Sequence, residues 1–128
     1  MSHCSQDEKS AKEEIQRMPK SDQNAAHYFI ETHLEARRGE AIAFIETASG
    51  KRISYSTLSA NTSKVAGALT RAGIKREERA AILMLDSIDY VEVFWGCLKA
   101  GVIAVPINTL LAGAVYDTIL SDSRASCL

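Results

Sequence analysis

The sequence predicts an α/β fold in which a β-hairpin precedes a βαβ unit with parallel strands. Two short apolar runs, 80–85 and 102–107, have the length and composition of strands that are covered on both faces. The connection between them is about 16 residues long and has helical periodicity. Parallel strands need a crossover of this length, and such crossovers are right-handed.

The composition limits the chain to one small domain of ordinary globular character. It has 128 residues, of which 46% are hydrophobic and 24% charged, with a formal net charge of −1. This charge gives no general attraction to nucleic acid or to an anionic membrane. No apolar run reaches the roughly 20 residues that span a bilayer, and Met1–Glu8 lacks the features of a secretory signal. We therefore expect a cytoplasmic protein that binds neither nucleic acid nor membrane.

The first 22 residues differ from the remainder of the chain. Residues 1–22 are polar and charged without an apolar period, and Pro19 marks a break near their end. Such a segment buries too little surface to offset the entropy of ordering it, so we predict a disordered polar tail. The predicted domain is then 23–128.

Two helices are predicted before the βαβ unit, at 24–38 and 57–72. Asn24 is a good N-cap for the first helix, which Gly39 would end. The second helix has a clear apolar face and would end at Gly73.

A β-hairpin is predicted between these helices. Its strands are 41–46 and 51–55, and the turn 47–50 ends in a glycine that suits a tight backbone. Ser54 or Ser56, at the end of the second strand, would cap the helix that follows.

The βαβ unit has recognisable ends. Asp86 and Ser87 are candidate caps for the crossover helix, and Gly101 would terminate it. Pro106 is tolerable in the second strand because pairing should already be fading there. A further helix is predicted at 112–121, with its apolar side facing inward: Val115, Tyr116 and Ile119. A following strand would begin where the sequence stops.

No metal site is predicted from the residues that most often bind metals: Cys4, Cys97, Cys127, His3, His27 and His33. The cysteines are odd in number and widely spaced, so they suggest neither a disulfide framework nor a zinc site. His27 and His33 lie six apart on one predicted helix and so do not share a face. Cys97 falls in an apolar helical pattern, which is typical of a small core residue.

The most interesting polar residues are Asn108 and Thr109, which follow the carboxyl end of a predicted parallel strand. Ligands of open α/β sheets bind at such ends. We favour the simpler interpretation, in which both residues turn the chain into the next helix. Trp95 is likewise interpreted as core packing, and Asp86 and Asp89 as support for a helix dipole. No glycine-rich phosphate loop is present. The residues by themselves therefore predict no catalytic, cofactor-binding or metal site.

The βαβ unit nevertheless resembles the amino-terminal region of the acyl-CoA synthetases, a superfamily that also holds luciferases and peptide-synthetase adenylation domains. The segments that carry this resemblance are Arg79–Ser87 and Phe94–Leu111. Three others look like the benzoate– and 4-hydroxybenzoate–CoA ligase branch: Asn24–Phe29, Ile53–Leu58 and Asp122–Ala125. The resemblance covers about residues 24–126. It implies that 23–128 is a partial N-terminal subdomain of an AMP-dependent synthetase/ligase, truncated before the rest of the fold.

The resemblance also implies a parent reaction. A carboxylate attacks the α-phosphate of ATP to give an acyl-adenylate and pyrophosphate, and the thiol of CoA then displaces AMP. The parent would use ATP, Mg²⁺ and CoA, whereas the family's phosphate loop, adenine segment, ribose aspartate and catalytic lysine have no counterpart here. Some relatives place a basic residue against CoA where this chain has Leu110 and Leu111, so no CoA contact is carried over. Because a charged phosphoryl centre needs positioned cations and donors, we expect the fragment to be inactive by itself and to hold no cofactor.

Three hypotheses remain. The first is a fragment of an aromatic-acid–CoA ligase, whose acid substrate the sequence does not indicate. The second is a non-enzymatic α/β interaction module. The third is a small flavodoxin-like nucleotide binder, which ATP or FMN would stabilise. An unfinished sheet leaves an exposed edge and uncovered apolar faces, so we expect marginal stability and self-association through that edge.

Overall fold

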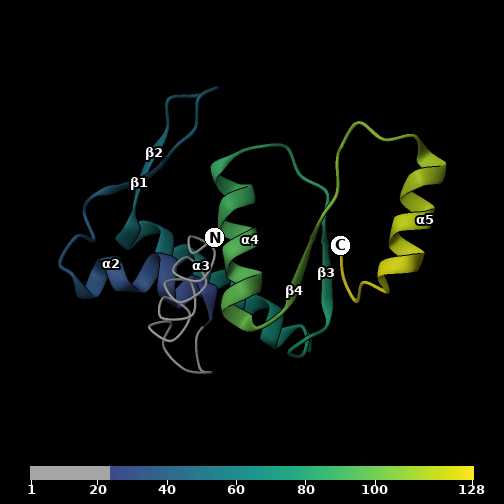
Figure 1. The fold of residues 1–128 in the computed structure, drawn as a ribbon, viewed down its shortest axis with the longest axis horizontal. Coiled ribbons are helices and arrows are strands. Elements are labelled where there is room, and N and C mark those ends of the chain that lie inside the picture. The colour runs from purple at the N-terminus through teal and green to yellow at the C-terminus, as the bar shows by residue number, and fades with distance from the viewer. Residues whose placement is uncertain (1–23) are drawn as a thin grey trace, which may run out of the picture.

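The computed structural model describes residues 24–128, so the predicted tail at 1–22 lies outside the described residues. The elements follow in the order η1 (His27–Glu31, a π-helix), α2 (Thr32–Glu35), β1 (Ile42–Ile45), β2 (Arg52–Ser54), α3 (Tyr55–Arg71), β3 (Arg79–Ile82), α4 (Ile88–Ala100), β4 (Ile103–Pro106) and α5 (Gly113–Ser123). Figure 1 shows the hairpin and the parallel strands at opposite sides of α4. The predicted α/β class, with a hairpin followed by a βαβ unit, is confirmed.

The hairpin forms as the sequence predicts. β1 and β2 pair antiparallel from Ile42 opposite Ser54 to Ile45 opposite Arg52, with an irregularity between Ile42 and Phe44. Gly50 closes the turn with a φ of 74°, a conformation that costs glycine little.

The parallel pair is also present, and it has a third neighbour. β3 and β4 pair from Arg79 opposite Ile103 to Ile82 opposite Pro106. On the other edge of β3, Cys127 bridges to Ala80 in parallel. The order across this part of the molecule is therefore β4, β3 and then the segment around Cys127. The predicted following strand thus begins to pair at Cys127.

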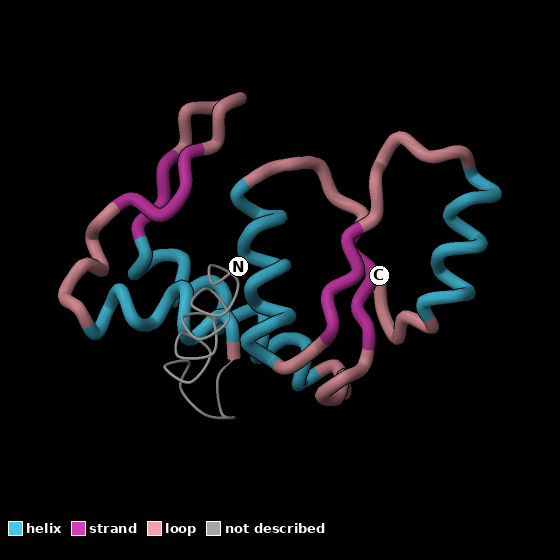
Figure 2. The backbone as a smooth tube through the Cα atoms, in the orientation of Figure 1, coloured by secondary structure: helices cyan, strands magenta, loops and turns pink. Residues whose placement is uncertain are grey.

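This order places α4 and α5 on opposite faces of the strands. The chain passes from β3 to β4 through α4 and then returns through α5 to the other edge of β3. Because crossovers of parallel strands are right-handed, connections that run in opposite directions lie on opposite faces. Figures 1 and 2 show the two helices on either side of the strands. The arrangement is doubly wound, with its reversal at β3.

Pro106 occupies the outer edge of β4. The backbone N–H groups of Ile103 and Ile107 donate towards β3, to the carbonyls of Glu78 and Ile82. Alternation along the strand turns the backbone of Pro106 to the free edge, where its missing N–H costs no hydrogen bond. Proline is tolerated because its nitrogen faces the free edge, and, as predicted, it stands where pairing ends, at the last residue of β4. A strand that paired with the free edge of β4 would meet one backbone N–H donor fewer, because Pro106 has none.

Helix ends follow the predicted caps. Ser54 Oγ, not Ser56, accepts from the N–H of Thr57 at 3.3 Å and so begins α3. Ser87 Oγ accepts from the N–H of Tyr90 at 3.1 Å and begins α4. Gly101 ends α4 in the left-handed conformation, with a φ of 73°.

Two predicted element ends and one predicted buried side chain differ from the structure. The first helical stretch ends at Glu35 rather than at residue 38, because Arg37 adopts the left-handed conformation that was expected nearer Gly39. The strand predicted at 80–85 ends at Ile82, after which the backbone leaves the ladder. In α5, Val115 is exposed rather than inward, whereas Ile119 and Tyr116 are half-buried.

Two apolar clusters share α4. The first contains Ala26, Ile30, Ile53, Leu58 and Ile88, with Trp95 packed against it. The second contains Ala80, Ile82, Cys97 and Val102. Trp95 packs near the rings of Phe29 and Phe94, as expected of a core residue. Among residues 24–128, no helix has the length and apolar character required to cross a bilayer.

The crossing of α3 and α4 is close at Gly96. A Cβ at this position would lie 2.5 Å from the Cβ of Val65 and 3.2 Å from the carbonyl oxygen of Thr62. These neighbours belong to the body of α3 and cannot move independently. Only a residue without a side chain therefore permits this separation of the helices.

We predict that Gly96→Ala destabilises the fold. The methyl group forces α3 and α4 apart, at a cost of about 1–3 kcal/mol for overpacking that outweighs the gain in helix propensity. Chemical denaturation monitored by circular dichroism measures the change. The matched control is Gly67→Ala in α3, where the new Cβ would meet only the flexible end of Arg71. That variant should be neutral or more stable by up to about 1 kcal/mol. Equal effects of the two substitutions would contradict the tight crossing.

We also predict that Cys97 is chemically inert in the folded chain. Its side chain is 1% exposed, and burial, with a further contribution from Cys127, raises its pKa from 9.0 to about 11. A rise of this size lowers the thiolate fraction about 100-fold at neutral pH. In a Cys4→Ser background, a disulfide reagent at pH 8 should label Cys127 quickly and Cys97 only after unfolding. Labelling of both thiols at one rate would contradict the burial of Cys97.

Candidate functional site

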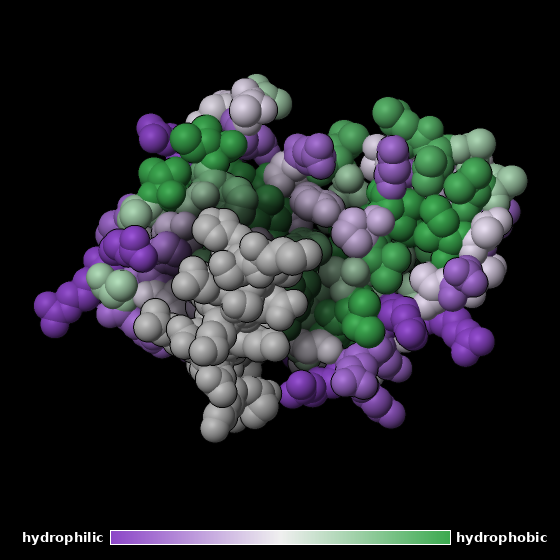
Figure 3. Space-filling model, in the orientation of Figure 1, coloured by the Kyte–Doolittle hydropathy of each residue, from purple (hydrophilic) through white to green (hydrophobic). Residues whose placement is uncertain are grey.

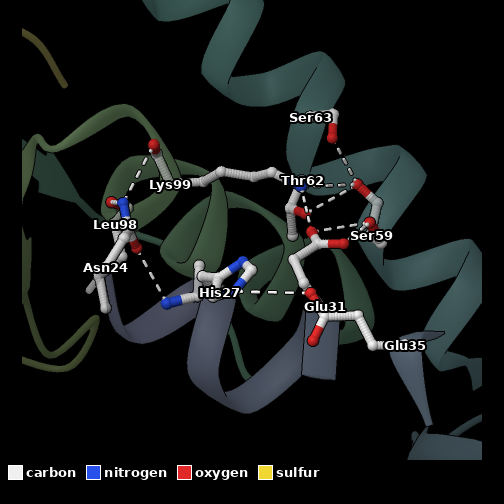
Figure 4. A network of polar contacts seen from close by, with 10 residues as sticks. Asn24, His27, Glu31, Glu35, Ser59, Thr62, Ser63, Leu98 and Lys99 are labelled. Atoms are coloured by element: carbon white, nitrogen blue, oxygen red, sulfur yellow. Dashed lines mark hydrogen bonds and ion pairs between the residues drawn. The ribbon is translucent and has the colours of Figure 1, made fainter. Parts of the chain in front are cut away.

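A polar network joins η1, α3 and α4 on the side of the molecule away from the parallel strands. Glu31, the last residue of η1, accepts hydrogen bonds from the Ser59 hydroxyl at 2.8 and 2.9 Å. The Lys99 ammonium group forms an ion pair with the same carboxylate. Figure 4 shows Glu31 pointing between the two helices towards both partners. Three segments that are distant in sequence therefore meet at one carboxylate.

The π-helical turn brings Glu31 to this position. The N–H of Thr32 donates to the carbonyl of His27, five residues earlier, in place of the usual four. A π-helical turn holds one residue more than an α-helical turn, which shifts the side chains that follow around the axis. Such turns recur at functional sites, which makes the network a candidate site.

The electrostatics favour a charged Glu31. Burial of the carboxylate, the largest single effect, pulls its pKa upward. The hydrogen bonds from Lys99 and Ser59, together with the charge of Lys99, outweigh burial and hold the pKa below its ordinary value of 4.5. Glu31 is thus a poor proton acceptor at neutral pH.

The network therefore acts as a cross-link rather than as a catalytic group. Ser59 is buried, and its hydroxyl donates to a carboxylate that is already neutralised by Lys99. An activated serine instead needs a base that takes its proton. His27 Nε2 lies 3.7 Å from Glu35 at the surface and forms no hydrogen bond to Ser59. Sequence reasoning missed Glu31, Ser59 and Lys99, because no spacing in the chain links them.

Asn24 has a second role beyond the predicted cap. Its Oδ1 accepts from the N–H of Ala26 at 2.9 Å, as expected for the start of a helix. Its Nδ2 donates to the carbonyl oxygens of Leu98 and, at 3.1 Å, Lys99. One amide thus begins the first helical stretch and satisfies carbonyls at the end of α4 (Figure 4).

The carboxyl end of β4 forms a turn. Asn108 Oδ1 accepts from the N–H of Leu110 at 2.9 Å. The Tyr116 hydroxyl donates to the carbonyl of Asn108 at 3.0 Å and accepts from the N–H of Leu111 at 3.1 Å. These bonds support our favoured interpretation, in which Asn108 and Thr109 lead the chain towards α5.

A surface hollow of about 490 Å³ lies beside this turn and reaches from Met84 to Leu110. Its polar side chains come from two loops and the first turn of α4: Asp86, Tyr90, Asn108 and Thr109. The hollow lies at the carboxyl ends of β3 and β4, whereas open α/β sheets bind their ligands where the strand order reverses, which here is between β3 and the segment around Cys127. The hollow therefore gives no independent evidence for a ligand site.

The donor set does not fit a metal ion. Within the part of the chain that the structure describes, no three His, Cys, Asp or Glu side chains converge closely enough to hold one. His33 stacks on the ring of Tyr55 with centroids 3.8 Å apart, while His27 faces Glu35. The two helical histidines are thus engaged separately.

We predict that Glu31→Gln destabilises the chain by about 1–3 kcal/mol at pH 7, because Lys99 loses its charged partner. A carboxylate with a lowered folded-state pKa stabilises the fold above its unfolded value, and this contribution is lost as pH falls below 4.5 towards the folded value. The difference between the variant and the natural chain should therefore shrink in that range. Denaturant titrations from pH 3 to 7 measure it. Glu35→Gln, at the exposed end of the His27 contact, is the control and should change little. Identical pH profiles for Glu31→Gln and the natural chain would contradict the cross-link.

Comparison with known proteins gives one consistent result. The family described as "AMP-binding enzyme" matches residues 30–128. The chain is 36% identical over 108 residues to the 4-hydroxybenzoate–CoA/benzoate–CoA ligase of Rhodopseudomonas palustris, covering 84% of this chain and 20% of that protein. It is 40% identical over 81 residues to the long-chain-fatty-acid–CoA ligase FadD13 of Mycobacterium tuberculosis, covering 63% and 16% of the two chains.

The solved structures agree with this match. The benzoate CoA ligase of Burkholderia xenovorans LB400 superposes with a TM-score of 0.73 at 33% identity, over 80% of this chain and 20% of that one. The chain spans about one fifth of the length of the curated relatives it matches. Because the family match covers most of the sequence and continues through the hairpin and the doubly wound unit, the chain belongs to the AMP-binding enzyme family.

Proposed function

We propose that the chain is part of an aromatic-acid–CoA ligase. In the parent reaction a carboxylate, ATP and CoA give acyl-CoA, AMP and pyrophosphate through an acyl-adenylate. The observation that carries this proposal is the 36% identity over 108 residues to a ligase named for benzoate and 4-hydroxybenzoate. A benzoate–CoA ligase of Thauera aromatica matches over 103 residues at 35% identity. The match to a long-chain-fatty-acid ligase is shorter, at 81 residues, so we favour an aromatic acid.

We propose further that these residues alone do not catalyse the reaction. A ligase of this kind would use ATP, Mg²⁺ and CoA, and the described residues bring together no three His, Cys, Asp or Glu side chains that could hold the metal ion. Phosphoryl chemistry depends on cations and donors held around the developing charge. We therefore assign no residue to these groups and derive no step through them. A ligase that draws on ATP and CoA would work in the cytoplasm, where we place the protein.

A second candidate function is an α/β interaction module without enzymatic activity. It is favoured by large apolar side chains at the surface, of which Leu110 is 89% exposed. The coding DNA beyond Leu128 distinguishes the two candidates. A continuing or frameshifted frame that encodes a phosphate loop would support the ligase, whereas a clean stop without ligase-like sequence would favour the module.

We predict no turnover by the 128-residue chain and activity in a chimera. Purified chain with benzoate, ATP, Mg²⁺ and CoA should give no benzoyl-CoA by liquid chromatography. In the chimera, residues 30–128 of this chain replace the aligned segment of the R. palustris ligase, which supplies the remaining four fifths of a ligase. Because the two proteins share the family fold, the chimera should form benzoyl-CoA.

Two controls frame that experiment. The unaltered R. palustris ligase sets the rate, and its remainder without any amino-terminal segment sets the background. Benzoyl-CoA formed by the isolated chain would contradict our proposal that it is inactive. A folded chimera without activity would contradict the ligase assignment.

A further inference from the structure

The two faces of the β3 and β4 pair differ in how well they are covered. Side chains on the face towards α4 are packed in a cluster that includes Ala80, Ile82 and Cys97, with Ala104 against it. Alternation places the neighbouring residues of each strand on the opposite face, towards α5. This second face is covered less completely, because Ala81 is buried there but α5 contributes only half-buried side chains, such as Tyr116 and Ile119.

Three large apolar side chains belong to the open face. Ile103 lies on β4 opposite Arg79, on the face opposite to Ala104. Leu83 follows β3 directly, and the next residue, Met84, packs against the cluster on the α4 side, so Leu83 lies towards the opposite face. Leu128 comes one residue after the bridge between Cys127 and Ala80, which places it beside Ala81. We call this set, Leu83, Ile103 and Leu128, the α5-side face.

The α5-side face is exposed to an unusual degree for a strand face. Leu83 is 41% exposed, Ile103 44% and Leu128 74%, whereas Ala81 between them is buried. Figure 3 shows apolar residues gathered over this part of the molecule, around β3, β4 and α5. Large exposed apolar side chains that share one face of a sheet mark a place where another layer of protein packs.

We propose that the α5-side face is the docking surface for the remainder of an AMP-binding ligase. This proposal rests on the proposed function, and it identifies the surface that the rest of the same ligase would contact. The superposition covers 80% of this chain and 20% of the benzoate CoA ligase, so the remainder of such a ligase is about four times as long as the matched segment. The strand order agrees, because β3 already accepts a parallel neighbour at Cys127, whereas Pro106 removes a donor from the β4 edge. A further strand can therefore pair beyond the segment around Leu128, which itself belongs to the α5-side face.

The experiment compares identical substitutions in two contexts. Leu83→Asp and Leu128→Asp place a charge on the α5-side face, and Leu110→Asp is the control at a more exposed leucine, which lies in the loop after β4 and outside that face. Each is made in the 128-residue chain and in the chimera with the R. palustris ligase. Melting is followed by circular dichroism, and mass by light scattering.

In the chimera, Leu83→Asp and Leu128→Asp should lower the melting temperature by at least about 4 °C, because a charge would be buried in an apolar contact. Leu110→Asp should shift it by no more than about 1 °C. In the 128-residue chain, where the face is open, none of the three should lower the melting temperature by more than about 2 °C. This contrast between contexts supports docking.

Several results would overturn the proposal. An unsubstituted chimera that does not fold shows that the face does not fit the remainder. Equal decreases in the melting temperature of the chimera for the substitutions at Leu83, Leu128 and Leu110 would show that the α5-side face is no more buried than the control position. No decrease for Leu83→Asp or Leu128→Asp would show that the face stays exposed to solvent. If the 128-residue chain is a dimer that Leu83→Asp disperses, the face belongs to a second copy of the chain. Benzoyl-CoA formation is scored separately, so a folded but inactive chimera with the predicted melting contrast rejects the ligase assignment and retains the docking surface.

Discussion

Helix α4 belongs to both apolar clusters, and its close contact with α3 at Gly96 fixes the distance between the two halves of the molecule. The same crossing sets the polar cross-link. Ser59 precedes Thr62 by one turn on α3, and Lys99 follows Gly96 by one turn on α4. The separation that lets the backbones touch at Gly96 therefore also brings Ser59 and Lys99 to the carboxylate of Glu31. The ion pair between Glu31 and Lys99 therefore depends on the apolar packing of α3 against α4.

The elements that were predicted well are those whose signals lie within a few residues. The caps at Ser54 and Ser87 and the left-handed glycines at Gly50 and Gly101 follow from local backbone chemistry, which a sequence displays directly. The end of the first helix was predicted too late, because that prediction also relied on a local signal, the glycine at position 39. A glycine is the usual left-handed residue, but here Arg37 takes that conformation, and no local signal marks it.

The polar network lay beyond sequence reasoning because its partners are far apart along the chain. Ser59 and Lys99 are 28 and 68 residues from Glu31, and Asn24 is 74 residues from Leu98. Such pairs exist only once α3 and α4 have packed. A π-helical turn also shifts the helical periodicity by one residue, so a pattern of three and four does not assign Glu31 to the buried side.

The strand order has a consequence for how the chain is made. β3 is central, yet both of its neighbours come later in the sequence, at β4 and at Cys127. As a ribosome extends the polypeptide from its amino terminus, β3 leaves the exit tunnel with neither hydrogen-bonding edge satisfied. One edge closes when β4 has emerged, and the other waits for Cys127, some forty-seven positions after Ala80. Synthesis therefore passes through a stage in which the middle of the sheet is open to chaperones, because non-local pairing is the last to form.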